Sequence, residues 1–215
     1  SSYLFDLIQY QKTVQQRNAL LKSFAKNRYF DKDSLEIYDD PISNFGTRIF
    51  EKRKEFVEKL NPIVQHFYEI ISGGKEIVNV IYESHLFDNN FKELLSSSID
   101  KDRALTYTSK GTHKDDLLFE MNGNSIKKIG SQGQQKSFLI SLKLAQINRI
   151  KELTRKSPIL LLDDIFDKLD DTRVSQLIEL VNKESFGQIF ITDTHKERTE
   201  NVVRRISEES KIFEI

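Results

Sequence analysis

The stretch "PILLLDDIFDKLD", residues 158–170, decides the fold class of this 215-residue chain. Its unbroken apolar run predicts a fully buried β-strand. Asp163 and Asp164 follow that run, and the carboxyl ends of parallel strands form the edge where open α/β folds bind ligands. One acid there can hold Mg²⁺ through water, and the next can orient or deprotonate an attacking water. The alternative is a capped strand end with two solvated acids.

A glycine-containing loop lies upstream of this strand. The stretch "GSQGQQKSFL", residues 130–139, opens a helix that we expect from about residue 134 to 153. The Ser131 hydroxyl, the Gly133 amide and the helix N-terminus together predict an anion pocket, since glycine lets the backbone approach a phosphate. The alternative is a flexible turn that Ser131 caps.

The remaining segments complete an α/β pattern. Asn122-Gly123 is the centre of a predicted hairpin turn. The predicted helices cover residues 91–99 and 173–183. The predicted strands cover residues 77–82, 104–109, 117–121, 126–129, 187–194 (buried) and 211–215.

Two segments carry apolar residues at heptad spacing, residues 3–24 and 49–70. They predict two long helices that pack against each other in antiparallel fashion. Each apolar seam is broken once, by Arg17 and by Arg53, which either pair with acids or bind a partner. Pro62 is expected to kink the second helix or to end its first half.

Helix boundary signals suggest a division of the chain. Asp40-Pro41 is a favourable helix start, and the sequence Ser-Gly-Gly at 72–74 is a stop. We therefore expect a helical arm over residues 1–75 and an α/β part over residues 76–215.

Composition narrows the class of protein. Lys plus Arg and Asp plus Glu both number 33, so a zero net charge neither indicates nor excludes nucleic acid. The chain has no cysteine, which fits a reducing compartment. No apolar run approaches the ~20 residues of a membrane span, and no secretory signal opens the chain. Because it starts with Ser1-Ser2, we expect that it is processed or cut from something longer.

The motifs resemble the RecF family of bacterial recombination-repair proteins. "GSQGQQKSFLISLKLAQ" (130–146) and "PILLLDDIFDKLD" carry the resemblance, together with "YQKTVQQRNALLK" (10–22) at the start of the arm. "GTHKDDLLFEMNG" (111–123) resembles the family's Gly-Pro-His-Arg-Asp-Asp-Leu segment, with Thr112 for Pro and Lys114 for Arg. Lys114 keeps the charge but loses the planar fork of arginine.

The resemblance implies an ABC-type ATPase head related to SMC proteins, with ATP and Mg²⁺ as cofactors. Asp163 would be the Walker B ligand of Mg²⁺, and Asp164 would occupy the position of the catalytic base. Leu169-Asp170 would be the D-loop, which contacts the partner of the dimer. The signature loop would bind the γ-phosphate of ATP held by the opposite subunit, and it would comprise Ser131, Gln132, Gly133, Gln134 and Gln135.

Two features leave the nucleotide site incomplete. Candidates for sensing the γ-phosphate are Thr192 and His195, although a lone surface histidine is the safer interpretation of His195 and Thr192 is at least as good a candidate. A P-loop, G-x-x-x-x-G-K followed by Ser or Thr, is missing, because Glu76 follows Gly74-Lys75 where a hydroxyl is needed. The family places its Walker A lobe before the arm, so we expect a C-terminal portion that does not hydrolyse ATP alone.

The resemblance also implies partners. A RecF protein would form an ATP-dependent homodimer that clamps DNA at junctions of single and double strands, in the bacterial cytoplasm. It would act with RecR and RecO to help RecA load. The run Lys52-Arg53-Lys54 is a candidate DNA contact or an ordinary solvated helix face.

Three other functions stay open. The first is a partner-binding module without catalysis, in which the arm binds and the α/β part is scaffold. The second is another SMC-like head, which the short arm disfavours. The third is a metal-dependent nuclease using Asp115, Asp116, Asp163 and Asp164, which leaves the glycine loop unexplained.

Overall fold

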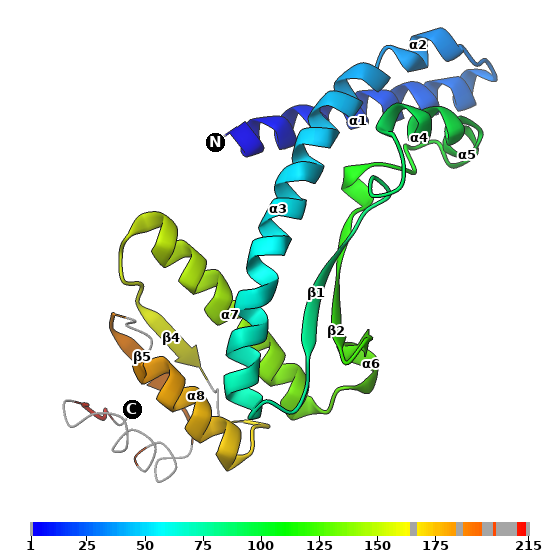
Figure 1. The fold of residues 1–215 in the computed structure, drawn as a ribbon. Helices are drawn as coiled ribbons and strands as arrows, with labels where there is room; N and C mark the ends of the chain where they lie inside the picture. The colour runs from blue at the N-terminus through cyan, green and yellow to red at the C-terminus, as the bar shows by residue number, and fades with distance from the viewer. Residues whose placement is uncertain (1, 164–166, 184–186, 195–199, 201–209, 214–215) are drawn as a thin grey trace. The chain divides into compact units, whose positions relative to one another are not determined.

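The computed structural model describes residues 2–163, 167–183, 187–194, 200 and 210–213. The chain forms two compact units. Unit 1 comprises Ser1–Glu58 and Ile81–Leu118, and unit 2 comprises Lys59–Val80 and Phe119–Ile215. Three elements contribute residues to both units, and they are α3 (Asp39–Ser72), β1 (Val78–Glu83) and β2 (Asp116–Met121) (Figure 1). The division into an arm and an α/β part at residue 75 stays a prediction.

In unit 1, α1 (Ser2–Asn27) lies along the first half of α3, and α2 (Lys32–Glu36) lies between them in the chain (Figure 1). The two long helices and their antiparallel direction confirm part of the heptad prediction, but α1 contacts residues 39–53 of α3, so most of the predicted seam over residues 49–70 does not face α1. Their polar contacts run in opposite directions along the sequence, which makes the pair antiparallel. These contacts are Arg17 with Asp39, Arg48 with Asp6, and Arg53 with Tyr3.

The core of unit 1 forms where α1, α3 and a pair of short helices meet. Burial of these side chains from water is the main force that holds the helices together. The short helices are α4 (Phe91–Ser97) and α5 (Ile99–Leu105). The main buried cluster consists of Tyr10, Val14, Ile42, Ile49, Phe91 and Leu95.

The predicted strand over residues 104–109 is wrong. The helix α5 runs to Leu105, and Thr106 ends it with φ of 59°, in the left-handed region. The backbone amides of Thr108 and Ser109 then donate to the side chains of Asn18 and Asp102, at 2.7 and 2.8 Å. Side chains therefore satisfy the backbone groups that a strand would have paired.

Pro62 does not end α3, which runs unbroken to Ser72. Leu60, Val64 and Phe67 are buried on either side of it, so packing outweighs the hydrogen bond that proline removes. The predicted stop is confirmed. Gly73 and Gly74 both adopt φ of 75°, and the Gly74 amide donates to the Glu69 carbonyl at 2.9 Å.

The hairpin prediction is confirmed. Strand β2 pairs with β3 (Asn124–Ser125) in antiparallel register, and Asn122 and Gly123 join them with φ of 50° and 76°. The order of this sheet is β1-β2-β3. Residues 126–129, however, form the helical turn α6 (Ile126–Ile129) and not a strand. The Gly130 amide closes that turn by donating to the Ile126 carbonyl at 2.9 Å.

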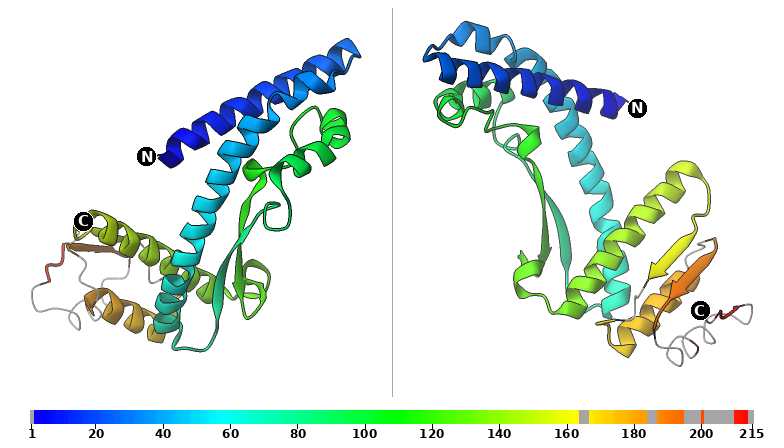
Figure 2. Two further views of the ribbon diagram at one scale, coloured as in Figure 1. Left: turned by 45° about the horizontal axis from the view of Figure 1, so that its top comes forward. Right: turned by 180° about the vertical axis from the view of Figure 1, so that it is seen from behind.

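The rest of unit 2 follows a helix–strand–helix–strand order. It comprises α7 (Gln132–Thr154), β4 (Leu160–Asp163), α8 (Asp171–Lys183) and β5 (Ile189–Thr192). The two strands are parallel neighbours and pair Leu160 with Ile189 through Asp163 with Thr192 (Figure 2). All four elements were predicted.

Burial of β4 and β5 differs from the prediction. Leu160 and Leu162 are buried, whereas Leu161 is 71% exposed and Phe190 of β5 is 48% exposed. One face of the two-stranded sheet is therefore open, since a strand alternates its side chains between two faces. The predicted last strand is also wrong over residues 211–213, and residues 214–215 lie outside the described part. Among the described residues no helix is both long and apolar enough to span a membrane.

Candidate functional site

The predicted glycine loop forms the N-terminus of α7. Ser131 is the N-cap residue, and its hydroxyl accepts a hydrogen bond from the Gln134 amide at 3.3 Å. The Gln134 side chain in turn accepts from the Ser131 amide at 2.8 Å, which completes a capping box. The Gln135 side chain donates to the Gly130 carbonyl at 2.8 Å. The loop is therefore held by its own side chains.

The loop presents backbone amides that make no helical hydrogen bond. The first helical hydrogen bond of α7 runs from the Gln135 amide to the Ser131 carbonyl, so the amides of Gln132 and Gly133 precede the helical ladder. Ser131 and Gln132 are exposed. An exposed helix N-terminus with a hydroxyl and orphan amides favours an anion such as a phosphate oxygen.

Gly133 packs against the segment that precedes α8. A Cβ atom at this position would lie 3.1 Å from the Lys168 carbonyl oxygen. Leu169 is buried, and the exposed Asp170 accepts a hydrogen bond from the Arg173 amide at 2.8 Å at the start of α8. The structure thus places the predicted signature loop next to Lys168, the residue that directly precedes the predicted D-loop residues.

A largely buried ion pair that sequence reasoning missed connects these two loops. Glu76 accepts from the Gln134 side chain at 2.8 Å and lies 3.7 Å from Arg173. Arg173 also donates to the Ser137 hydroxyl at 2.9 Å and lies 3.4 Å from the Asp170 carboxylate. Both charged side chains are only 12% exposed. Glu76 is 97 positions from Arg173 in the chain, so no local spacing could have paired them.

Asp163 and Thr192 end the two parallel strands side by side. They are partners in the register, and the Thr192 hydroxyl donates to one Asp163 carboxylate oxygen. Asp163 is exposed at this edge, and carboxylate oxygens are ligands that Mg²⁺ prefers. Its chemistry therefore fits the predicted metal role. Asp164 and His195 lie outside the described residues. Within the described ranges no three His, Asp or Glu side chains gather into a metal cluster.

The charged candidates of unit 1 are engaged within it. Arg53 donates to the Thr112 carbonyl at 2.6 Å and to Asp115 at 3.0 Å. Lys52 lies 3.4 Å from Glu55, and Lys54 lies 5.9 Å from the centre of the Phe87 ring. Of the two alternatives for the arginines, pairing with acids is therefore the one that the structure supports. Asp115, a ligand in the nuclease alternative, is committed to Arg53 and Tyr82.

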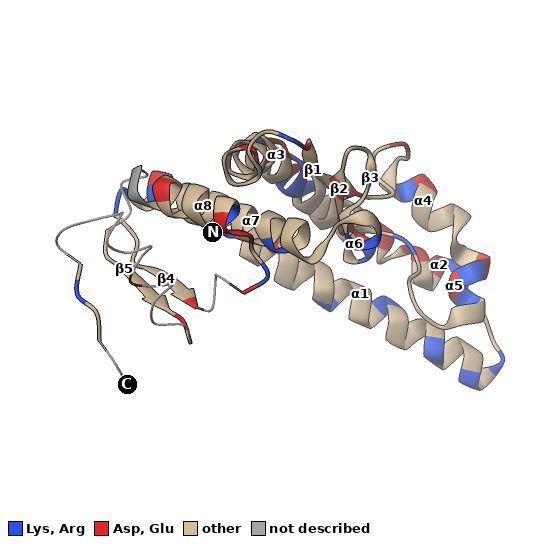
Figure 3. Ribbon diagram, turned by 90° about the horizontal axis from the view of Figure 1, so that it is seen from below, with Lys and Arg blue, Asp and Glu red and all other residues tan. Residues whose placement is uncertain are grey.

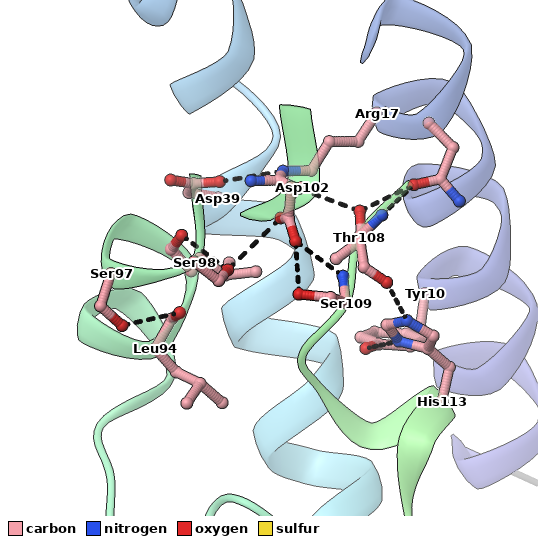
Figure 4. Close-up of polar contacts among 12 residues, drawn as sticks. Tyr10, Arg17, Asp39, Leu94, Ser97, Ser98, Asp102, Thr108, Ser109 and His113 are labelled. Carbon is pink, nitrogen blue, oxygen red and sulfur yellow. Dashed lines mark hydrogen bonds and ion pairs between the residues drawn. The ribbon is translucent and has the colours of Figure 1, made fainter. Parts of the chain in front are cut away.

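Arg17 is the centre of a second polar network (Figure 4). It donates to Asp102 at 2.6 Å and to the Thr108 hydroxyl at 2.9 Å. His113 continues the network, because its ring nitrogens contact the Thr108 carbonyl at 2.9 Å and the Tyr10 hydroxyl at 2.8 Å. Burial raises the pKa of Tyr10 to about 12, so this hydroxyl stays protonated. The network links α1 to α5 and to the segment 108–113 within unit 1.

The fold and the site define a class of protein, an α/β chain in which two long helices accompany a capped glycine loop and an acid at the end of a parallel strand. Comparison with solved structures supports this class. The chain matches the "Structure of the recombination mediator protein RecF-ATP in RecFOR pathway" with a TM-score of 0.77 at 32% identity, over 91% of this chain and 54% of that one. A related structure, RecF-ATPrS, gives a TM-score of 0.75 at 30% identity, again over 91% and 54%.

The chain belongs to the RecF family. It is 57% identical to the DNA replication and repair protein RecF of Flavobacterium johnsoniae over all 215 residues, which are 60% of that protein. It is 44% identical to RecF of Phocaeicola vulgatus over 99% of this chain and 57% of that protein. No family model matches the chain. The chain therefore spans somewhat more than half the length of the curated relatives that it matches.

Proposed function

We propose that this chain supplies the signature-loop and Walker B side of an ATP-gated dimer in a RecF-type recombination-repair protein. The closeness of Gly133 to the Lys168 carbonyl, which an added Cβ atom would approach to 3.1 Å, supports the proposal, because Lys168 directly precedes the D-loop residues Leu169 and Asp170. A nucleotide bound at the signature loop would thereby change the position of the D-loop.

In this proposal the residues divide the work. Ser131 and the amides of Gln132 and Gly133 bind the γ-phosphate of ATP that another subunit holds, while Gln134 and Gln135 keep the loop in shape. Asp163 would hold Mg²⁺, and Thr192 orients its carboxylate. Leu169 and Asp170 belong to the surface that meets the partner. Asp164 is the proposed base for the attacking water.

The wider role follows from the family. The dimer would close on DNA at junctions of single and double strands in the bacterial cytoplasm. RecR and RecO would act with it, and hydrolysis would release the DNA. Contacts to phosphate would make this binding sensitive to salt.

Light scattering tests the proposal. The chain would be co-expressed with the lobe that carries the Walker A loop in RecF proteins, and its mass measured with and without ATP and Mg²⁺. We expect the mass to double with ATP. Ser131→Arg should abolish the doubling by filling the anion pocket, whereas Ser96→Arg, at an exposed position of α4, should leave it intact.

Two results would contradict this function. One is a complex that binds ATP but keeps its mass. The other is a mass that doubles equally well in Ser131→Arg. Either would favour the partner-binding module, in which the arm acts without regard to nucleotide.

A further inference from the structure

The end of α1, the turn that follows it and α5 line an open pocket within unit 1. This tip pocket has a volume of about 480 Å³, within the ~300–1,000 Å³ of sites that hold small organic groups. Aromatic rings and charged side chains line it, principally Phe24, Arg28, Tyr29, Phe30, Asp100 and Arg103. None of these residues takes part in the site proposed in unit 2.

The rings of the tip pocket form a fixed aromatic wall. Phe24 packs edge-on against Tyr29, with centroids 6.1 Å apart, and against Phe30 at 5.5 Å. The Arg103 guanidinium lies 4.0 Å from the centre of the Phe30 ring. Arg28 turns the chain with φ of 52°, and the Tyr29 amide donates to the Phe24 carbonyl at 3.2 Å. The turn holds the rings while leaving Tyr29 62% exposed.

Cations surround this wall. Figure 3 shows Lys and Arg along the end of α1 and on α5. Only Arg103 among them has an acidic partner in the part of the chain that the structure describes, Asp100 at 3.4 Å. Asp31 is occupied as the N-cap of α2. The exposed cations at this tip are Lys22, Lys26, Arg28, Lys101 and Arg103.

We propose that the tip pocket binds single-stranded nucleic acid. One unstacked base would stack on the exposed face of Tyr29, and Arg28, Lys26 and Lys101 would contact the flanking phosphates. The exposed ring of Tyr29 offers a stacking face, and the neighbouring cations without an acidic partner among the described residues offer contacts to phosphate. A duplex offers phosphates alone, because its bases are stacked on each other and have no face for Tyr29.

The combination of cations and an exposed ring also favours single-stranded nucleic acid over an acidic peptide. An acidic peptide would satisfy the cations but leave the exposed ring of Tyr29 without a planar partner. The proposal gives a surface to the nucleic acid partner suggested above and in that respect rests on the proposed function. Binding at the tip pocket needs no ATP in unit 2. Its test can therefore fail while the light-scattering test succeeds, and the reverse.

The test measures binding of a fluorescein-labelled single strand of about 12 nucleotides to the whole chain, by anisotropy and without ATP. We expect Tyr29→Ala to weaken binding about ten-fold and Tyr29→Phe to retain it, since stacking needs the ring and not the hydroxyl. A titration between about 50 and about 200 mM salt gives the number of phosphate contacts. Arg28→Gln should reduce the slope of log affinity against log salt by about 0.7.

The matched control is Lys12→Gln, which removes an exposed charge from the same helix about 15 Å from Lys22. It should bind like the unmodified chain. The proposal is overturned if the chain does not bind the strand, or if Tyr29→Ala and Arg28→Gln bind it normally. It is also overturned if a duplex of the same sequence, or a polyglutamate peptide of the same length, competes as well as the unlabelled strand. Thermal melting of each variant shows that it is folded.

Discussion

Arg17 of α1 and Asp102 of α5 form an ion pair at 2.6 Å with both side chains fully removed from solvent. The two residues are 85 positions apart in the chain, so this contact closes unit 1 across a long loop. Asp102 also accepts from the amide and hydroxyl of Ser109, at 2.8 and 2.6 Å. This buried pair should contribute strongly to the stability of unit 1, because removing Asp102 leaves Arg17 with the more distant Asp39 carboxylate at 3.5 Å.

Asp102→Ala should therefore lower the free energy of unfolding by about 3–5 kcal/mol, because it removes the nearest counter-charge of the buried Arg17 guanidinium. Urea unfolding followed by circular dichroism measures this loss. The matched control is Arg48→Met, which breaks an ion pair whose arginine is 53% exposed and should cost less than about 1 kcal/mol. Equal losses in the two variants would show that burial does not set the strength of the Arg17 pair.

Arg173 and Glu76 form a second pair whose loss should be costly. Arg173→Met removes the partner of Glu76 and the donor to Ser137, so we expect a loss of about 1–3 kcal/mol in unfolding free energy. A double-mutant cycle with Glu76→Gln isolates the coupling between the two side chains. Additive effects of the two substitutions would mean that the pair does not link the loops. Arg149→Met, whose ion pair with Glu152 lies on the α7 surface, is the control.

Gly46 should not tolerate a side chain. A Cβ atom there would meet the Phe91 ring and lie 2.9 Å from Cε2 of Tyr10. Gly46→Ala gains helix propensity of about 1 kcal/mol, but overpacking a core typically costs about 1–3 kcal/mol. We expect a net decrease in the melting temperature. Thr47→Ala, at an exposed position on the same helix, should leave it unchanged or raise it. A stabilised Gly46→Ala would show that Phe91 can move aside.

The stability of unit 1 should depend on the protonation of His113. This residue is exposed, but both ring nitrogens face protein groups, and loss of water around them lowers the pKa from its ordinary value of about 6.5. The unfolded chain then binds the proton more readily than the folded chain. The stabilising contribution is complete above about pH 6.5 and is lost as the pH falls toward the lowered pKa.

Unfolding free energies measured from about pH 7.5 down to about pH 5 would reveal this dependence, because this range spans the ordinary pKa of histidine. His113→Gln should flatten the profile. His66→Gln, at an exposed position of α3, should reproduce the profile of the unmodified chain. A profile that stays the same in His113→Gln would assign the dependence to other groups.

The long helices and the hairpin could be predicted because their signals are local. Heptad spacing gave α1 and α3, and Asn122-Gly123 gave the turn between β2 and β3. The segment over residues 104–109 has an apolar and β-branched pattern that favours a strand. Its backbone is instead bonded to Asn18 and Asp102, which are distant or side-chain partners that no pattern within the segment encodes.

The candidate site shows the same division. The positions of Ser131 and Gly133 at a helix start and of Asp163 at a strand end could be predicted, because a capping hydroxyl, a glycine and acids after an apolar run are local signals. Glu76 and Arg173 could not, because their role arises only when the fold brings α7 and α8 together. The open face of β4 was also not predicted. An apolar run predicts that a strand is buried, but it does not show which element packs against each face.

The continuous course of α3 through Pro62 has a consequence for dissecting this chain. The backbone passes from one unit to the other three times, at 58/59, 80/81 and 118/119. Neither unit is therefore a single uninterrupted stretch, and no single cut frees one intact. A fragment ending at residue 75 would keep Arg17 and Arg53 but lose Asp102 and Asp115, the acids that neutralise them. The fully buried Arg17 side chain would then keep Asp39 at 3.5 Å but lose its nearer acid and its bond to the Thr108 hydroxyl, so the fragment would bury a poorly compensated charge.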